Sequence, residues 1–460
     1  MSFTARFPIM WLLAASISLS TLSPAAAGWK SGCAKRAITP QSLMWMSGYA
    51  SRDRPAEGTL HDLWAKAIVL EDAAGNRVAL VTLDLVGIDR ELSLAIRGAI
   101  ESKYGLARQQ IAICCSHTHT GPVVGDGLRA MYFLDDDQQA RVIEYTARLK
   151  DIVVAVVGPA IADLAPAQLS WATGRTTFAV NRRNNPERDV SKLRAAGQLR
   201  GPVDHDVPVL AVRDPSGTVR SVVFGYACHA TVLDFYQWSG DYPGFAQLAL
   251  EAAHPGAVAL FWAGCGADQN PLPRREVAHA ESYGRRLAAA VDDVLGAPMK
   301  PIEGQLVAQY EEIDLPFDQL PTREQLVQDA AAENRYVASR AKLLLAQIDS
   351  GKPLSPTYPY PVQSWRLGKE LLFVLLGGEV VVDYAIRIKH DLGRDTTWVA
   401  GYANDVKAYI PSRRVLAEGG YEGGGAMVYY GLPTVWSTEV EERIVQQVNG
   451  LGNLLRAAKR

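Results

Sequence analysis

Two histidines, His117 and His119, stand two residues apart directly after an apolar segment, residues 111–115. On an extended backbone, residues i and i+2 face the same side, so both imidazoles would point to one side of the chain. Two imidazoles in that arrangement can bind a divalent metal together, or one can bind the metal while the other moves a proton. Solvated loop histidines show the same spacing, so the pair alone does not establish a site.

Three further apolar segments end in polar or small residues. The residues in question are His229 after segment 219–227, Asp268 and Asn270 after segment 257–262, and Glu379 after segment 371–376. In open α/β sheets, ligands bind at the carboxyl ends of strands, so we expect these side chains to meet at one edge of a sheet. Two histidines and one carboxylate are the ligand set of a hydrolytic zinc site with an open position. The chain has no HExxH motif, so separated segments would supply the ligands.

Each of these residues also has a purely structural explanation. His229 alone could be a core histidine with satisfied hydrogen bonds. Glu379 alone could be a carboxylate that a helix N-terminus stabilises. The four strand ends together favour a functional site, because carboxylates rarely follow apolar strands directly without a partner.

The elements that must position these residues alternate between strand and helix patterns. Residues 64–70 and 78–85 predict a β-hairpin, residues 91–104 a helix, and residues 111–115 the next strand. A long helical segment, 139–164, contains Pro159, which predicts a kink or a stop. Residues 322–348 predict one amphipathic packing or lid helix. We therefore expect an α/β fold, in which helices flank a mixed β-sheet core with the metal site at strand C-terminal ends.

Composition narrows the class of protein. The 460 residues are 48% hydrophobic and 21% charged, which is typical of a globular protein with a sizeable core. The formal net charge of −2 and the lack of a basic run argue against a nucleic-acid partner. No internal repeat or low-complexity linker divides the chain, which favours a single large domain. The five cysteines form no CxxC motif, which favours buried thiols over a zinc–thiolate site.

The N-terminus has the pattern of a secretory signal peptide. Arg6 precedes a largely apolar stretch, residues 8–22, and an A-x-A motif predicts cleavage after Ala27. A membrane anchor is the alternative, but four serines make the stretch too polar and too short to span a bilayer well. No other apolar run reaches about 18 residues. We expect residues 1–27 to be removed and a secreted or periplasmic protein without a transmembrane segment to remain. The sequence does not predict its oligomeric state.

Several motifs resemble those of the neutral/alkaline ceramidases. They are SHTHTGP at 116–122, LHDLWAKAIVL at 60–70, the GxxADQNP turn at 264–271, GGE at 377–379, the NxxxxY segment at 404–409, and YEGG at 421–424. These motifs follow one another in order from Gly48 to about Gly425. The resemblance implies that residues 28–460 form the catalytic N-terminal domain of this family, without the C-terminal immunoglobulin-like domain.

The resemblance also implies roles for particular residues. One Zn²⁺ per chain would be bound by His117, His229, Glu379 and Tyr409, while His119 would lie beside the metal and handle a proton. Arg182 would orient the substrate, Asn270 would bind it, and Tyr421 would donate to the developing oxyanion. Zinc lowers the pKa of a bound water to about 7 and polarises a carbonyl, which suits this set of residues.

One departure from the family pattern affects the expected substrate. Asp268 stands where the family has a serine that is central to ceramidase activity. A carboxylate cannot copy a hydroxyl's hydrogen bonding, but it could act as a general base, a metal ligand or a substrate contact. We therefore hypothesise that Asp268 is functional and that the substrate is not ceramide.

The resulting functional prediction is a secreted zinc-dependent amidohydrolase. It would cleave an amide bond in an N-acylated small-molecule or lipid-like substrate by means of a metal-activated water. One alternative is a zinc hydrolase that acts on an ester, a lactone or a glycan-derived compound, because of Asp268. A second alternative is a non-catalytic binding protein on the same scaffold, although every expected metal-ligand position is retained.

Overall fold

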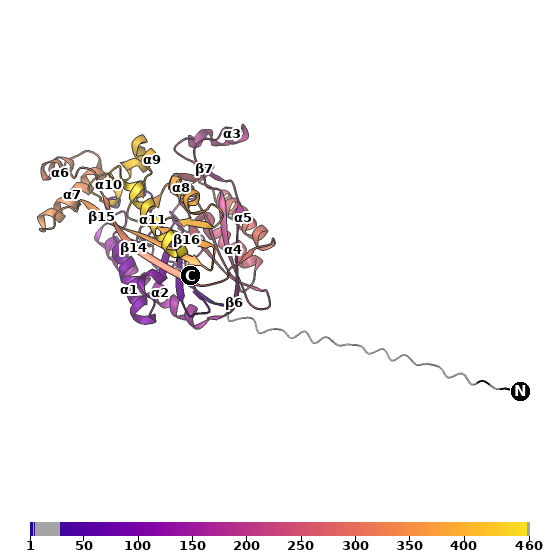
Figure 1. The fold of residues 1–460 in the computed structure, drawn as a ribbon. Helices are drawn as coiled ribbons and strands as arrows, with labels where there is room; N and C mark the ends of the chain where they lie inside the picture. The colour runs from indigo at the N-terminus through magenta and orange to yellow at the C-terminus, as the bar shows by residue number, and fades with distance from the viewer. Residues whose placement is uncertain (3, 5–27, 458–460) are drawn as a thin grey trace.

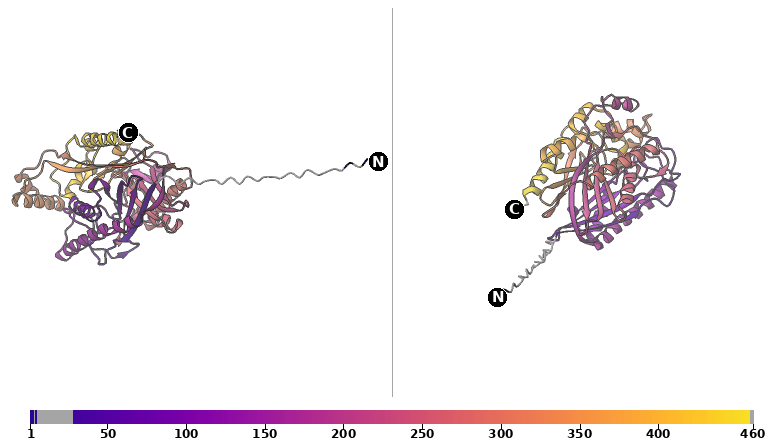
Figure 2. Two further views of the ribbon diagram at one scale, coloured as in Figure 1. Left: turned by 60° about the horizontal axis from the view of Figure 1, so that its bottom comes forward. Right: turned by 90° about the vertical axis from the view of Figure 1, so that its right-hand side faces the viewer.

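Two β-sheets pack face to face, and helices cover the outer face of each sheet (Figure 1). The computed structural model describes residues 1–2, 4 and 28–457. The apolar stretch and the cleavage site of the predicted signal peptide lie outside the described residues. In Figure 2 (right), the purple helices and the yellow C-terminal helix lie on opposite sides of the sheets.

The larger sheet is mixed and has nine strands in the order β11-β9-β8-β6-β1-β3-β4-β5, with β13 also paired to β6. Its strands are β1 (Trp29–Ala37), β3 (Trp64–Glu71), β4 (Arg77–Leu83), β5 (Ile111–Cys115), β6 (Ala165–Arg175), β8 (Asp206–Arg213), β9 (Val219–Tyr226), β11 (Val258–Ala263) and β13 (Lys300–Pro301). The pairs β4–β5 and β9–β11 are parallel, and the other pairs are antiparallel. This arrangement confirms the predicted mixed sheet and the β3–β4 hairpin.

Strands β3, β4, β5, β9 and β11 of the larger sheet are buried on both faces, which explains why they are nearly continuous apolar runs. In β5, Ile111, Ile113 and Cys115 face the helices, while Ala112 and Cys114 face the second sheet. This alternation follows from the two-residue period of a strand. The helices on this side are α1 (Arg90–Tyr104), α2 (Asp136–Ala162), α4 (Asp241–Ala253) and α5 (Val277–Leu295).

The second sheet has four strands in the order β14-β15-β16-β18. They are β14 (Leu306–Pro316), β15 (Thr357–Leu367), β16 (Leu371–Leu376) and β18 (Thr397–Ala400). Aromatic side chains fill the space between the two sheets, where the rings of Trp262 and Phe373 lie 4.9 Å apart. Helices α8 (Val382–Leu392) and α11 (Val440–Ala457) cover the outer face.

Short elements surround the strand ends. They are β2 (Gly58–Thr59), β7 (Ala179–Asn181), β10 (Gln237–Trp238), β12 (Gln269–Pro271), β17 (Glu379–Val380), β19 (Tyr409–Ile410), α3 (Val190–Ala195), α9 (Arg413–Glu418), α10 (Met427–Tyr430), the 3-10 turns η1 (Arg108–Gln110) and η2 (Glu187–Asp189), and the π-helical turn η3 (Tyr421–Gly425). No helix among the described residues is long and apolar enough to cross a bilayer.

Two helix predictions need correction. The segment predicted as one helix over residues 322–348 forms two, α6 (Arg323–Asp329) and α7 (Arg335–Asp349), at the left of Figure 1. A second helix begins at Arg335 because the Asn334 side chain caps its N-terminus, accepting hydrogen bonds from the backbone N–H groups of Tyr336 and Val337. Pro159 does not stop α2 at once, because the helix continues for three residues beyond it, to Ala162.

Candidate active site

The polar ends of several strands meet at one place, as the apolar-to-polar transitions in the sequence indicate. His117 and His119 follow β5, and His229 follows β9. A β-bridge between Thr118 and Ala230 holds these two strand ends together. Glu379 begins β17, which follows β16 and pairs in parallel with β19, so that Glu379 lies opposite Tyr409.

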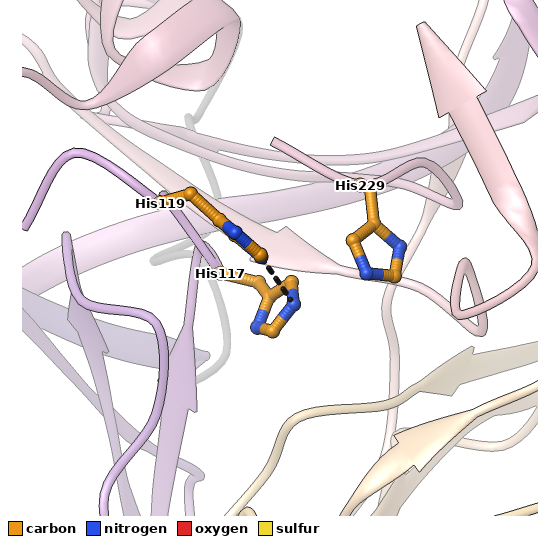
Figure 3. A group of neighbouring side chains, drawn as sticks. All are labelled: His117, His119 and His229. Carbon is orange, nitrogen blue, oxygen red and sulfur yellow. Dashed lines mark hydrogen bonds between the residues drawn. The ribbon is translucent and has the colours of Figure 1, made fainter. Parts of the chain in front are cut away.

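Three buried imidazoles form the centre of the site (Figure 3). The nitrogens that His117, His119 and His229 offer all lie within 4.8 Å of one another. The Nε2 atoms of His117 and His119 are 3.1 Å apart. The carboxylate of Glu379 joins this group, since its Oε2 lies 3.2 Å from the Nε2 of both His117 and His229. The phenol oxygen of Tyr409 lies 3.2 Å from the Nε2 of His229.

The backbone around the histidine pair differs from the extended conformation that the sequence suggested. His117 has a φ of 60°, in the left-handed region that non-glycine residues rarely adopt. The two imidazoles still meet, but a turn brings them together rather than the two-residue period of a strand. Backbone strain of this kind is typical of functional sites.

Hydrogen bonds to backbone carbonyls orient two of the three imidazoles. The Nδ1 of His117 lies 2.6 Å from the carbonyl oxygen of Val86, and the Nδ1 of His229 lies 2.8 Å from that of Gly266. A carbonyl can only accept, so both rings carry their proton on Nδ1 and direct the lone pair of Nε2 toward the cluster.

His119 is held differently. Among the described residues, its buried Nδ1 has no hydrogen-bond partner. Its ring packs instead against Tyr49, with ring centroids 4.7 Å apart. Gly48 makes room for it, because a Cβ built on this glycine would lie 2.5 Å from the Nδ1 of His119.

Glu379 has one oxygen engaged and one that faces the cluster. Its Oε1 accepts a hydrogen bond from the hydroxyl of Tyr430, a residue that the sequence did not single out. Its Oε2 is buried and has no hydrogen-bond donor in the described part of the chain. An orphaned carboxylate oxygen among imidazole lone pairs is costly unless a cation neutralises it.

The spacing of these atoms fits a single metal ion. Ligands about 2.1 Å from a tetrahedral ion lie roughly 3.4 Å from one another. The distances from Glu379 to the two histidines and from His229 to Tyr409 are each 3.2 Å, close to that value. Imidazole and carboxylate donors are also ligand types that suit a zinc-like ion.

The electrostatics of the site keep two of its imidazoles, His119 and His229, in the neutral form that a metal requires. Burial lowers the pKa of His119 well below its usual value, and burial together with Arg182 lowers the pKa of His229 to about 4. Deprotonated imidazoles and an ionised carboxylate are the forms that bind metals.

Arg182 forms one wall of the site. Its guanidinium donates to Glu422 Oε1 at 2.7 Å, to Asn270 Oδ1 at 3.1 Å and to the Tyr409 hydroxyl at 3.1 Å. The ring of Tyr421 lies 5.7 Å from this guanidinium and 5.2 Å from the ring of Tyr409. The structure therefore brings the three residues that the sequence indicated for substrate contact to the edge of the histidine cluster.

Asp268 is buried next to this wall, and other groups occupy both of its carboxylate oxygens. Oδ1 accepts from the backbone N–H of Val382 at the start of α8, and Oδ2 accepts from the side chain of Asn181. Burial raises the pKa of Asp268 to about 6. These contacts favour a positioning role over the general base, metal ligand or substrate contact that the sequence suggested.

The fold and the cluster together define a mixed α/β protein with a buried site suited to a metal ion. The family model for the N-terminal part of neutral/alkaline non-lysosomal ceramidases matches residues 29–268. The chain therefore belongs to the neutral/alkaline non-lysosomal ceramidase family, which is a family of hydrolases.

Relatives named as neutral ceramidases resemble this chain in sequence, and two solved structures share its fold. The neutral ceramidase of Pseudomonas aeruginosa is 23% identical, in a match that covers 90% of this chain and 72% of the relative. A neutral ceramidase of Drosophila pseudoobscura pseudoobscura is 27% identical over 52% of this chain but only 34% of its own length. The crystal structure of the Pseudomonas aeruginosa protein superposes with a TM-score of 0.74 at 21% identity, covering 94% of this chain and 75% of that one. A structure of a ceramidase complexed with C2 gives 0.73 at 20% identity, covering 94% of this chain and 76% of that one.

Proposed function

We propose that the protein is an exported zinc-dependent amidohydrolase that cleaves an N-acyl amide bond. The observation that carries this proposal is the buried Glu379 Oε2, which lacks a hydrogen-bond donor among the described residues and lies 3.2 Å from two imidazole nitrogens. Family membership supports a hydrolase, and the relatives' names as ceramidases support an amide substrate. When bound, zinc lowers the pKa of a water and polarises the substrate carbonyl.

His117, His229, Glu379 and Tyr409 would hold one zinc ion. His119 lies equally near, but its environment distinguishes it from the other two histidines. Metal-bound histidines almost always donate their second ring N–H to a carbonyl or carboxylate, which orients the ring. His117 and His229 make such contacts with Val86 and Gly266, whereas the Nδ1 of His119 makes none within the described residues.

The remaining residues would bind the substrate and move protons. His119, with a pKa well below the usual value, is a neutral imidazole that can accept a proton and deliver it to the leaving amine. Arg182 uses three of its donors within the protein and retains others for a developing oxyanion. The hydroxyl of Tyr421 can donate to the same oxygen. Asp268 acts indirectly, since it links α8 to Asn181, the last residue of β7, directly before Arg182.

Export and domain organisation form part of the same proposal. The signal-peptide pattern over residues 1–27 supports a secreted or periplasmic protein. Residues 28–460 would then act as one catalytic domain.

Metal removal and a substrate panel test the proposal together. Purified protein should release free amine from an N-acyl panel, lose that activity with a chelator, and regain it with Zn²⁺. Esters and lactones belong in the same panel, because faster turnover of either would favour the alternative substrate classes. Chelator-resistant activity would contradict the proposed chemistry. Metal binding without turnover of any class would favour a binding protein.

A further inference from the structure

A cavity of about 570 Å³ opens beside the histidine cluster. Arg182, Asn270 and Tyr421 form the part of its wall nearest the site. Arg182 connects the cavity to the cluster, because its guanidinium donates to the hydroxyl of Tyr409, which lies 3.2 Å from His229 Nε2. The cavity is large enough for a small-molecule substrate.

Charged side chains dominate this cavity and largely neutralise one another. Its lining includes three arginines and three glutamates, and Leu272 is its one aliphatic residue. Glu422 binds both Arg182 and Arg183, Arg183 also binds Glu418, and Arg274 binds Glu187.

An alkyl chain is a poor occupant of such a cavity. It would displace water from the charged groups without forming hydrogen bonds to them, so binding would cost a large desolvation free energy. A strongly charged ligand is also disfavoured, because the arginines and glutamates already balance one another. A hydroxyl group both donates and accepts, so a neutral ligand with several hydroxyls matches this lining.

One aromatic face completes the cavity. Tyr421 lines it and is 44% exposed, although most tyrosines near the cluster are buried. An exposed ring beside hydrogen-bonding groups offers an apolar surface for the C–H face of a ring-shaped, hydroxylated ligand.

We propose that the amine portion of the substrate is an uncharged, hydroxyl-rich ring, as in an N-acylated amino sugar, rather than a long-chain sphingoid base. This inference rests on the proposed amidohydrolase activity and adds its substrate class. It agrees with the replacement of the family serine by Asp268, but it stands on the charged lining and on the exposed ring of Tyr421.

A substrate panel and a binding assay test the inference separately from the activity. Zinc-loaded protein is assayed for amine release from N-acetylglucosamine and its dimer, from C16 ceramide in detergent micelles, and from N-acetyl amino acids. We expect kcat/KM for the amino sugars to exceed the other two classes by about 100-fold. A preference for ceramide or for N-acetyl amino acids would overturn the substrate class and leave the amidohydrolase intact.

Calorimetric titration of metal-free protein with the same amino sugars provides the second readout. Binding should weaken roughly tenfold in Tyr421→Ala but hold within about twofold in Tyr421→Phe, which keeps the ring. Binding without turnover would support the substrate class and contradict the amidohydrolase. Absence of amino-sugar binding and turnover, or equal losses in both variants, would overturn the inference.

Discussion

Glu422 offers a quantitative test of how the substrate wall is built. Its side chain is 5% exposed, and its two oxygens accept from Arg182 at 2.7 Å and from Arg183 at 2.6 Å. Removing one partner of a buried ion pair costs about 3–5 kcal/mol, but a glutamine keeps one acceptor and the shape of the side chain. We expect Glu422→Gln to lower the free energy of unfolding by about 2–3 kcal/mol at pH 7.

A neighbouring glutamate supplies the matched control. Glu418 also binds Arg183, but its side chain is 42% exposed. The same change there, Glu418→Gln, should cost less than about 1 kcal/mol, because exposed ion pairs are screened by water. Denaturant unfolding of both variants and the wild type provides the comparison. Equal losses in the two variants would refute the claim that Glu422 is the buried anchor of Arg182.

The pH dependence of the Glu422 effect has a definite sign. Burial alone would raise the pKa of Glu422, but Arg182 and Arg183 outweigh it and lower this pKa below its usual value of 4.5. A carboxylate with a depressed pKa contributes stability above the pKa of its unfolded state and loses it as the pH falls through the folded pKa. The difference between wild type and Glu422→Gln should therefore be full at pH 7 and shrink below about pH 4.5. A difference that grows in acid would contradict the assigned ion pair.

Three further changes test other parts of the site and the fold. Tyr430→Phe removes the hydrogen bond that orients Glu379, so metal affinity should fall about 10- to 100-fold when it is measured by chelator competition. Unchanged affinity would contradict this orienting role of Tyr430. Gly48→Ala places a Cβ about 2.5 Å from the ring of His119, so turnover should fall while the amount of bound metal stays near that of the wild type. Loss of the metal in this variant would indicate that His119 is a ligand. Burial raises the pKa of Asp405 from 3.8 to about 7, so its ionisation removes stability as the pH rises through that interval. Between pH 4 and pH 8, the free energy of unfolding of Asp405→Asn should rise by up to about 4 kcal/mol relative to that of the wild type, as measured by denaturant unfolding. A difference between the two proteins that does not change with pH would contradict the raised pKa.

Strand positions and the convergence of their polar ends were predictable from the sequence. The buried strands are apolar on both faces, so the change from Cys115 to His117, or from Leu376 to Glu379, stands out in the residue order. The sequence did not reveal that β5 and β9 lie near opposite ends of the larger sheet and that β16 lies in the second sheet, so their polar ends meet between sheets rather than along one edge. Backbone detail was not predictable, since the left-handed turn at His117 has no residue-type signal such as glycine.

Hydrogen bonds between residues far apart in the sequence could not be predicted from the sequence. Tyr430 was missed because it lies at the end of the four-residue helix α10, in a segment without a recognisable motif. Glu422 lies in the YEGG motif, yet its role depends on Arg182 and Arg183, about 240 residues earlier. Asp268 was expected to act directly, because residue order does not reveal that Asn181 and the N-terminus of α8 occupy its oxygens. The start of α7 after Asn334 could have been predicted from the sequence, since asparagine is a preferred N-cap residue.

Metal stoichiometry in matched histidine variants tests the central claim most directly. Elemental analysis of purified protein should find one zinc per chain in the wild type and in His119→Ala, but almost none in His117→Ala and His229→Ala. Each of the three variants removes one buried imidazole of the same cluster. A difference in zinc content between them therefore reports which histidines bind the metal. Zinc lost from His119→Ala but retained in His229→Ala would contradict the assigned ligands. Active wild-type protein without metal would contradict the proposed function itself.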